Sequence, residues 1–318
     1  MSLILVNLID GLVTGLLLFM LSSGLTLIFS MMGVLNFAHA SFYMLGAYFG
    51  YQISTYVGFW PGLVIGPVLV GVIGALIERY GLRRVHQYGH VPELIFTFGL
   101  ALLIEEVVQF FWGKGQIAFN VPESLKFALF TISGNAIPAY KVFMIFCSMG
   151  IFLVLLYILT RTRVGMVIQA ALSYPNTVEA LGHNVPMVFM GVFGVGTALA
   201  GIAGVIAGPT VGVFPGMAIQ LGSIVFVTIV VGGLGSLWGA LVASLLIGWI
   251  TNFAAAYSFR FSTIFEWLGL ERPANMAESL LRDAWTLTFP QIGPILPYLL
   301  MILILVLRPY GLFGKREV

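Results

Sequence analysis

Residues 141–160 read KVFMIFCSMGIFLVLLYILT, and no charged residue follows Lys141 within this stretch. An α-helix rises about 1.5 Å per residue, so about 20 apolar residues cross the roughly 30 Å of hydrocarbon in a bilayer. The apolar run is continuous and lacks the polar–apolar alternation of a membrane β-strand. The stretch therefore predicts a transmembrane helix.

The same apolar character extends over the whole chain of 318 residues. Hydrophobic residues make up 60% of the chain and charged residues only 8%, whereas an ordinary soluble domain has roughly 25% charged residues. Together these features predict an all-α polytopic membrane protein with about eight to nine transmembrane helices in a single domain, residues 1–318. The candidate spans lie near residues 4–30, 39–57, 61–78, 92–112, 141–160, 186–208, 219–234, 237–256 and 293–308.

Several classes of function are excluded by what the sequence lacks. The net charge is +2 and no block of Lys and Arg is present, so nucleic-acid binding is not expected. No histidines or cysteines have metal-ligand spacing, and no glycine-rich loop could hold nucleotide phosphates. We therefore expect no catalytic site, metal site or cofactor in this chain. If ATP drives the protein, a partner chain must bind the ATP.

The basic residues between the spans favour one orientation. Alternate connecting segments carry eight Lys and Arg residues on one side and six on the other, and the richer side is cytoplasmic. This bias predicts a cytoplasmic C-terminus and places residues 113–140 and 257–292 on the outer face. Within the second segment, the amphipathic run Ala274–Trp285 is expected to lie along the membrane surface or to meet a partner.

Two polar or glycine-rich stretches interrupt the spans. They are MMGVLNFAHAS at residues 31–41 and GGLGSLWGAL at residues 232–241. Corresponding interruptions in two halves of a membrane protein indicate an internal repeat with a site between the halves. We therefore expect two pseudo-repeated halves with discontinuous segments. The alternative is two tight turns that use glycine and asparagine for their backbone conformation.

Two carboxylates lie inside the fourth predicted span, Glu105 and Glu106. At that depth a carboxylate costs several kcal/mol unless it is neutralised, paired or hydrated. Adjacent side chains of a helix point in different directions, so at most one of them faces a central path. Gln109 follows Glu105 by four residues and shares its face. The alternative is that both glutamates reach outer-face water, or that Lys114 or Lys141 compensates one of them.

Four further polar residues are candidates for lining a path. A lone histidine beside a turn, such as His39, more often bonds a backbone carbonyl than a substrate. Ser41, Thr97 and Thr228 are compatible with a polar lining, but single hydroxyls in membrane helices usually bond their own helix.

Residues 160–186, TRTRVGMVIQAALSYPNTVEALGHNVP, form the most informative connecting segment. They predict a short helix over Gly165–Leu172, then a second helix with Ser173 as its N-cap and Pro175 in its first turn. Gly182 is expected to end this helix in a left-handed conformation. A short capped helix on the cytoplasmic side of the bilayer is suited to binding a soluble motor domain. The alternative is an ordinary loop with a surface helix.

Four blocks of the chain resemble the branched-chain amino-acid type of ABC-importer permease, the class that includes the high-affinity leucine, isoleucine and valine systems. The blocks are GVLNFAHASFYMLGAY (33–48), IERYGLRRV (77–85), RTRVGMVIQAALSYPNTVEALGHNV (161–185) and VVGGLGSLWGALVASLLIG (230–248). The resemblance implies a multi-pass permease subunit of the bacterial inner membrane. Its implied partners are a second homologous permease, two cytoplasmic ATPases that bind ATP and Mg, and a periplasmic substrate-binding protein.

The resemblance also assigns roles to residues. It implies that 161–185 is the segment that couples the permease to the ATPases, with Ser173, Asn176, Glu179, Ala180, Leu181 and Gly182 at or near the contact. It places the interruptions Asn36–His39 and Gly232–Ser236 close to the translocation path. With the polar residues above, the candidate substrate path is Asn36, His39, Ser41, Thr97, Glu105, Gln109, Thr228 and Ser236.

Three departures from the family pattern bear on the substrate. Ala40–Ser41 stand where many members have Gly-Glu, Glu105–Glu106 stand where neutral amides are usual, and 257–292 is longer than in typical amino-acid members. Relatives of this class also move urea, short amides and aromatic carboxylates. The expected function is therefore ATP-driven import of a branched-chain amino acid or of a related small amide or carboxylate. The alternative is an ion-coupled secondary transporter in which Glu105 titrates and carries the coupling proton.

Overall fold

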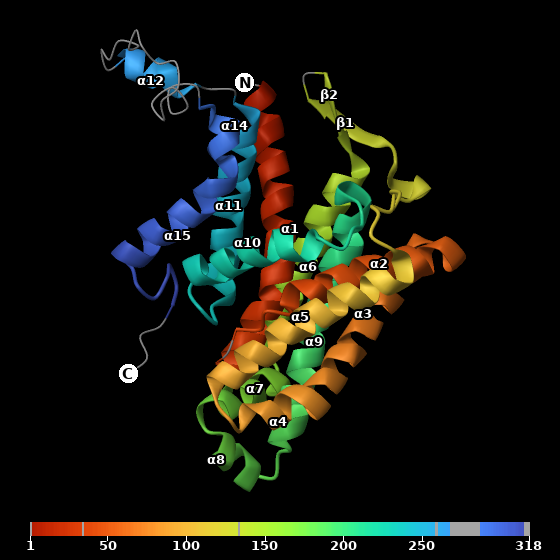
Figure 1. The fold of residues 1–318 in the computed structure, drawn as a ribbon, viewed down its shortest axis with the longest axis vertical. Helices are drawn as coiled ribbons and strands as arrows, with labels where there is room; N and C mark the ends of the chain where they lie inside the picture. Colours follow the sequence, from red (N-terminus) through yellow and green to blue (C-terminus); the bar gives the residue numbers. More distant parts are fainter. Residues whose placement is uncertain (1, 34, 133, 258–259, 268–286, 315–318) are drawn as a thin grey trace.

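The computed structural model describes residues 2–33, 35–132, 134–257, 260–267 and 287–314. They form an elongated bundle of helices (Figure 1), which confirms the predicted all-α membrane fold. Within the described residues the regular strands are β1 (Ala128–Ile132) and β2 (Asn135–Pro138), which pair as an antiparallel hairpin. The amphipathic run predicted at Ala274–Trp285 lies outside the described residues.

Seven helical segments of the described residues are long and apolar enough to cross a bilayer. The last of them consists of α14 (Phe289–Ile292), a 3₁₀ turn (Gly293–Ile295) and α15 (Leu296–Leu307). The other six contain α1 (Ser2–Met32), α3 (Phe59–Ile77), α5 (His90–Trp112), α6 (Ala139–Arg161), α9 (Val185–Val211) and α11 (Leu237–Ala256).

The two remaining predicted spans are helices of a different kind, α2 (His39–Val57) and α10 (Met217–Gly232). Neither is among the seven spanning segments. The 16 residues of α10 extend only about 24 Å, which is less than the hydrocarbon thickness. Most of α2 is buried, so it contacts protein rather than lipid and can be less apolar. In Figure 1 both helices run across the bundle rather than along α1.

Backbone contact between glycines holds α2 against α9. A Cβ atom on Gly46 would lie 2.3 Å from the carbonyl oxygen of Gly201, and one on Gly204 would lie 2.0 Å from the carbonyl oxygen of Tyr43. Small residues allow membrane helices to approach this closely. The crossing therefore tolerates no side chain at either position, and α2 is fixed in the centre of the fold.

Helix α11 packs along α1, and hydrogen bonds join the two helices near both ends of the pair. The Asn252 amide donates to the Thr14 hydroxyl over 2.9 Å. At the opposite end of the pair, the Ser30 hydroxyl donates to the carbonyl oxygen of Gly235 over 3.2 Å. The interruption after α1 and the one before α11 therefore lie side by side.

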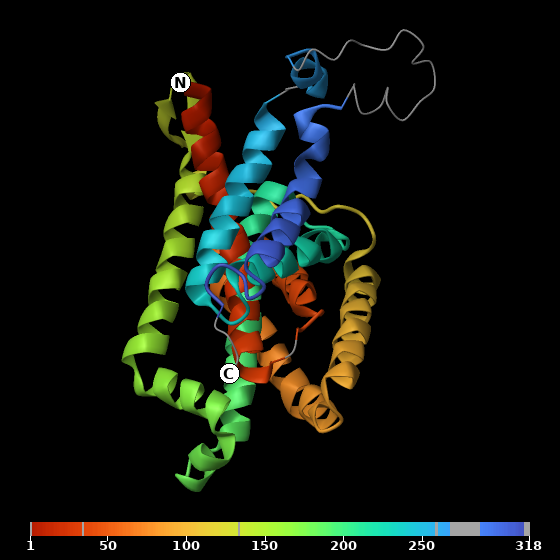
Figure 2. The ribbon, with the colours of Figure 1, turned by 90° about the vertical axis from the view of Figure 1, so that its left-hand side faces the viewer.

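The connecting segments gather at two ends of the bundle (Figures 1 and 2). One end, here called the hairpin end, carries the N-terminus, β1–β2 and α12 (Phe261–Trp267), and a 3₁₀ turn (Glu123–Leu125) precedes the hairpin in the chain. The other end, here called the α8 end, carries α4 (Arg83–His86), α7 (Arg163–Ser173) and α8 (Pro175–Ala180). This grouping is the one that the predicted topology requires.

Candidate functional site

The break between α1 and α2 is built around Asn36. Its side-chain oxygen accepts a hydrogen bond from the backbone N–H of Ala38 over 3.0 Å, which starts α2 at His39. The side chain is buried, and its amide nitrogen has no hydrogen-bond partner among the described residues. A buried amide N–H without a partner is costly, so this group is available to a molecule that enters from the break.

A cavity of about 590 Å³ opens beside this break, between α2, α5, α10 and α15. We call it the break cavity. Four of the predicted path residues line it: Asn36, His39, Ser41 and Glu105. The rest of its lining is mainly apolar and includes Leu25, Leu35, Phe98, Ala101, Phe226 and Met301. A mostly apolar cavity with a few convergent polar groups is typical of a small-molecule site.

His39 bonds a backbone carbonyl, as the sequence analysis expected for the alternative to a substrate contact. Its Nε2 atom lies 3.0 Å from the carbonyl oxygen of Leu21. A carbonyl oxygen can only accept, so Nε2 carries the proton in this bond. The other ring nitrogen, Nδ1, is buried and has no partner among the described residues. In the neutral ring this nitrogen is an acceptor.

Glu105 and Gln109 share one face of α5, as the spacing predicted. The Gln109 amide nitrogen lies 3.4 Å from a carboxylate oxygen of Glu105, and Glu105 lines the break cavity while Glu106 does not. The suggestion that Lys141 compensates one of these glutamates is wrong. Lys141 lies on α6 and pairs with Asp10 instead, at 2.5 Å.

The other predicted path residues lie outside the break cavity. Thr97 accepts a hydrogen bond from the backbone N–H of Phe37 over 3.3 Å, so it fastens α5 to the break. Thr228 donates to the carbonyl oxygen of Ile224 in its own helix. Ser236 caps α11 by accepting from the N–H of Gly239. The last two hydroxyls therefore have backbone partners and structural roles.

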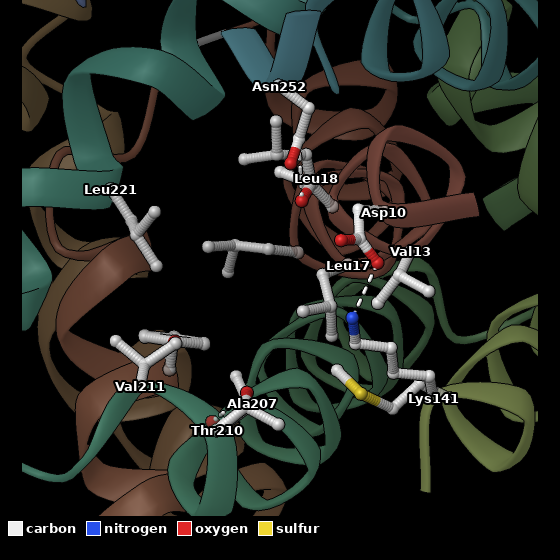
Figure 3. A pocket seen from close by; sticks show the side chains of 14 residues that line it. Asp10, Val13, Leu17, Leu18, Lys141, Ala207, Thr210, Val211, Leu221 and Asn252 are labelled. Atoms are coloured by element: carbon white, nitrogen blue, oxygen red, sulfur yellow. Dashed lines mark hydrogen bonds and ion pairs between the residues drawn. The ribbon is translucent and has the colours of Figure 1, made fainter. Parts of the chain in front are cut away.

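A second cavity, of about 340 Å³, was missed by the sequence analysis. We call it the ion-pair cavity, because Asp10 of α1 and Lys141 of α6 both line it (Figure 3). Thr14 and Asn252 add polar groups, and Thr210 lies across the cavity from Asn252. The signal for this site was an aspartate within the first apolar stretch and a lysine at the start of another, but nothing in the sequence joined the two.

The segment 161–185 is two helices that turn sharply from the end of α6. Thr162 caps α7 by accepting from the N–H of Gly165. The prediction that Ser173 caps the second helix is wrong, because α7 continues through Ser173 and Tyr174 precedes α8 without a side-chain cap. Gly182 follows α8 with φ +88°, which confirms the predicted left-handed end.

This coupling segment, residues 161–185, has its own small core. Ala171 of α7, Val178 of α8 and Val185 of α9 form a buried cluster. By contrast, Leu181 is 75% exposed and Tyr174 is 69% exposed. Asn176, Glu179, Ala180 and Gly182 are exposed as well. The segment is therefore a preformed element with an uncovered surface that contains large apolar side chains.

The comparisons with known proteins identify the family of the chain. The family model described as "Branched-chain amino acid transport system / permease component" matches residues 7–305. The chain belongs to this family. The permease is 24% identical to the high-affinity branched-chain amino acid transport system permease protein BraD of Pseudomonas aeruginosa, over 98% of this chain and 96% of the relative.

Two further relatives show how much of the permease the similarity covers. LivH of Escherichia coli K12, a high-affinity branched-chain amino acid transport system permease protein, is 25% identical over 97% of this chain and 95% of its own length. The probable permease LivH of Methanocaldococcus jannaschii is 26% identical over 94% of this chain and 89% of its own. No solved structure matches the permease.

A contact at the α8 end of the permease was also missed. After α3 the chain makes a π-helical turn (Glu78–Leu82) in which the Glu78 carboxylate is 1% exposed. Arg83 makes a bidentate pair with this carboxylate and also donates to the carbonyl oxygen of Pro186 over 2.7 Å. Because Pro186 lies in the first turn of α9, Arg83 joins the end of the coupling segment to the α3–α5 connection.

Proposed function

We propose that this permease is the membrane-embedded subunit of an ATP-driven importer for branched-chain amino acids or a related small amide or carboxylate. In this proposal it pairs with a second homologous permease in the bacterial inner membrane. Two ATPase subunits bind ATP and Mg on the cytoplasmic side, where the coupling segment and the C-terminus lie. A periplasmic binding protein delivers the substrate at the hairpin end.

The single observation that carries the proposal is the coupling segment in a chain of this family. Its internal core gives the segment a defined shape. Its exposed Leu181 and Tyr174 are the kind of apolar and aromatic side chains that partners bury. A motor that moves such a segment can shift the permease between two conformations by as much as its interaction energy differs between them.

The break cavity supplies the proposed path within this subunit. Asn36 offers an unpaired amide N–H and His39 an unpaired ring nitrogen, while Glu105 offers a carboxylate. These groups are few and lie among apolar side chains, so they would hold a small polar molecule weakly. Weak binding suits a transporter, because a substrate that is held tightly is released slowly.

The substrate is proposed from the relatives. The printed names of BraD and of the Escherichia coli LivH both describe high-affinity branched-chain amino acid transport. The same relatives favour an ATP-driven importer over the proton-coupled alternative in which Glu105 titrates, because their family is defined as a component of a transport system rather than as a self-sufficient carrier.

The coupling role can be tested with two matched glycine substitutions. Gly182 follows α8 with φ +88°, and Gly113 follows α5 at the other end of the molecule with φ +81°; a Cβ atom would meet nothing within 4 Å at either. A side chain therefore strains the backbone at both positions, and at Gly113, with φ +81° and ψ −176°, the conformation is one that essentially only glycine adopts. In the full assembly purified from native membranes and reconstituted in vesicles, Gly182→Val is expected to lower leucine uptake per ATP hydrolysed by about tenfold. Gly113→Val is expected to leave this ratio unchanged.

The companion variant Glu179→Ala removes an exposed carboxylate of α8 without straining the backbone. It is expected to lower the same ratio while the assembly still purifies intact. Coupled uptake at the wild-type ratio in both Gly182→Val and Glu179→Ala would refute the coupling role of this segment.

A further inference from the structure

The ion-pair cavity has a composition that the proposed transport path has not used. It lies between α1, α6, α9, α10 and α11, on the side of α2 and α10 away from the break cavity. Its volume of about 340 Å³ falls within the range of roughly 300–1,000 Å³ seen for small-molecule sites. Figure 3 shows Asp10, Lys141 and Asn252 on one side of an open space, with Val211 and Leu221 across it.

The two charges of the cavity are paired but not saturated. The Lys141 ammonium lies 2.5 Å from one carboxylate oxygen of Asp10, and the side chains are 33% and 30% exposed. An ammonium has three donors and a carboxylate has two acceptor oxygens, so one contact leaves capacity on both. The pair is neutral as a whole, and a ligand that is itself neutral as a whole can join it without burying a net charge.

Tyr43 adds a polar group that lacks a partner. Its side chain is 2% exposed and lines the cavity, and its hydroxyl makes no hydrogen bond to the described residues. A buried hydroxyl without a partner carries a desolvation cost. Asn252 differs, because its amide nitrogen is already bonded to Thr14 and to the carbonyl of Gly248. The Tyr43 hydroxyl is therefore a donor that a bound molecule's oxygen could use.

The rest of the lining is aliphatic. It includes Val13, Leu17, Leu18, Leu21, Met144 and Leu221. These side chains line the same cavity as the polar groups. A molecule with a positive group, a negative group and a branched aliphatic group would have a partner for each.

We propose that the ion-pair cavity binds one zwitterionic aliphatic α-amino acid. The ligand ammonium lies against Asp10, its carboxylate accepts from Lys141 and from the Tyr43 hydroxyl, and its side chain lies among the leucines. This inference rests on the proposed function, since it gives the transported class a site inside one subunit. The competing interpretation is that the Asp10–Lys141 pair only ties α1 to α6.

Direct binding separates the two interpretations. Tritiated leucine is added, over a millimolar concentration range and without ATP, to the membrane assembly purified without the periplasmic binding protein. Asp10→Asn and Lys141→Gln are each expected to weaken binding by about tenfold, the effect of losing one charge-assisted contact. Tyr43→Phe is expected to weaken it by a few fold. Lys126→Gln is the matched control, because Lys126 forms an exposed ion pair with Glu123 near the hairpin, and it is expected to bind leucine as the wild type does.

Two ligand analogues test the zwitterion requirement on the wild-type protein. Leucinamide lacks the carboxylate and 4-methylpentanoate lacks the ammonium, so each is expected to compete with leucine at least tenfold less well than valine does. Equal competition by either analogue would overturn the proposed ligand orientation.

A double variant with the charges exchanged, Asp10→Lys with Lys141→Asp, distinguishes binding from helix fastening. It keeps an ion pair between α1 and α6, so the melting temperature of the assembly is expected to return toward that of the wild type. Leucine binding is expected to remain weak, because the reversed charges turn the ligand side chain away from the leucines. Recovery of both properties together, or undiminished leucine binding in the single variants, would overturn the proposal.

Failure of the importer proposal would look different. Leucine binding is measured without ATP, whereas the importer proposal fails if ATP hydrolysis by the wild-type assembly drives no uptake. Wild-type uptake that persists at the normal rate in Asp10→Asn and Lys141→Gln would overturn this site and leave the importer proposal standing.

Discussion

The break cavity and the ion-pair cavity of this permease are neighbours with different chemistry. Leu21 lines the ion-pair cavity and Leu25, one helical turn further along α1, lines the break cavity. On α10 the adjacent residues Leu221 and Gly222 face one cavity each. The ion-pair cavity holds a complete ion pair, and the break cavity holds a carboxylate and single unpaired nitrogens. The difference indicates that the ion-pair cavity is suited to a molecule with both a positive and a negative group, while the break cavity offers only weak polar contacts.

The largest effect is expected from a substitution that disrupts the packing of α2, because α2 contributes residues to both cavities. Gly204→Val adds a side chain at a position where even a Cβ atom would lie 2.0 Å from the carbonyl oxygen of Tyr43. Because that obstacle is backbone, the substitution is expected to destabilise the fold by about 4 kcal/mol or more. The measurement is the yield of monodisperse protein and its melting temperature in detergent.

Gly191→Val is the control for this prediction, since it lies on the same helix and a Cβ atom there meets nothing within 4 Å. It is expected to behave as the wild type. If the two valine variants melt at the same temperature, the close α2–α9 crossing does not exist.

An intermediate effect is expected at His39, which connects the two cavities. The ring lines the break cavity, and its Nε2 bonds the carbonyl of Leu21 on the wall of the ion-pair cavity. His39→Leu removes this buried hydrogen bond, which is expected to cost about 0.5–1.5 kcal/mol. His39→Gln retains an N–H donor and is expected to recover part of the loss. Thermal unfolding of the two variants checks the order, and equal losses would contradict it.

The smallest effect is expected at Glu105, and it sharpens the distinction from a proton-coupled carrier. Glu105→Gln keeps the size of the side chain and loses only its charge. ATP-driven uptake is therefore expected to fall by about two- to fivefold, with no change in its dependence on a pH gradient. Reconstituted vesicles with and without the gradient provide the measurement. Complete loss of uptake while ATP hydrolysis continues would favour the carrier in which Glu105 titrates.

The sequence predicted local features well because they depend on nearby residues. Continuous apolar stretches located the nine longest helices of the described residues, and the spacing of four placed Gln109 beside Glu105. It could not show that α2 and α10 run across the bundle, since an apolar helix surrounded by protein has the same pattern as one surrounded by lipid. The sequence also predicted Ser173 as a cap. A serine two residues before a proline fits that role whether or not the preceding helix continues through it.

The candidate site was predicted only in part for a related reason. Asn36, His39 and Ser41 lie next to one another in sequence, so their convergence on the break cavity followed from one interruption. Asp10 and Lys141 are 131 residues apart, and their contact depends on the packing of α1 beside α6. Thr228 and Ser236 have the residue types of a polar lining but use their hydroxyls on backbone groups. Residue type does not reveal that choice.

Arg83 gives the α8 end a mechanical property. Its guanidinium bonds the buried Glu78 and the first turn of α9 at once, so the end of the coupling segment is tied directly to the α3–α5 connection. In the proposed importer, a displacement of the coupling segment would be passed through Arg83 toward α5, and Phe98 and Glu105 of α5 line the break cavity. The proposed ATPase partner would thereby change the width of the break cavity without contacting it.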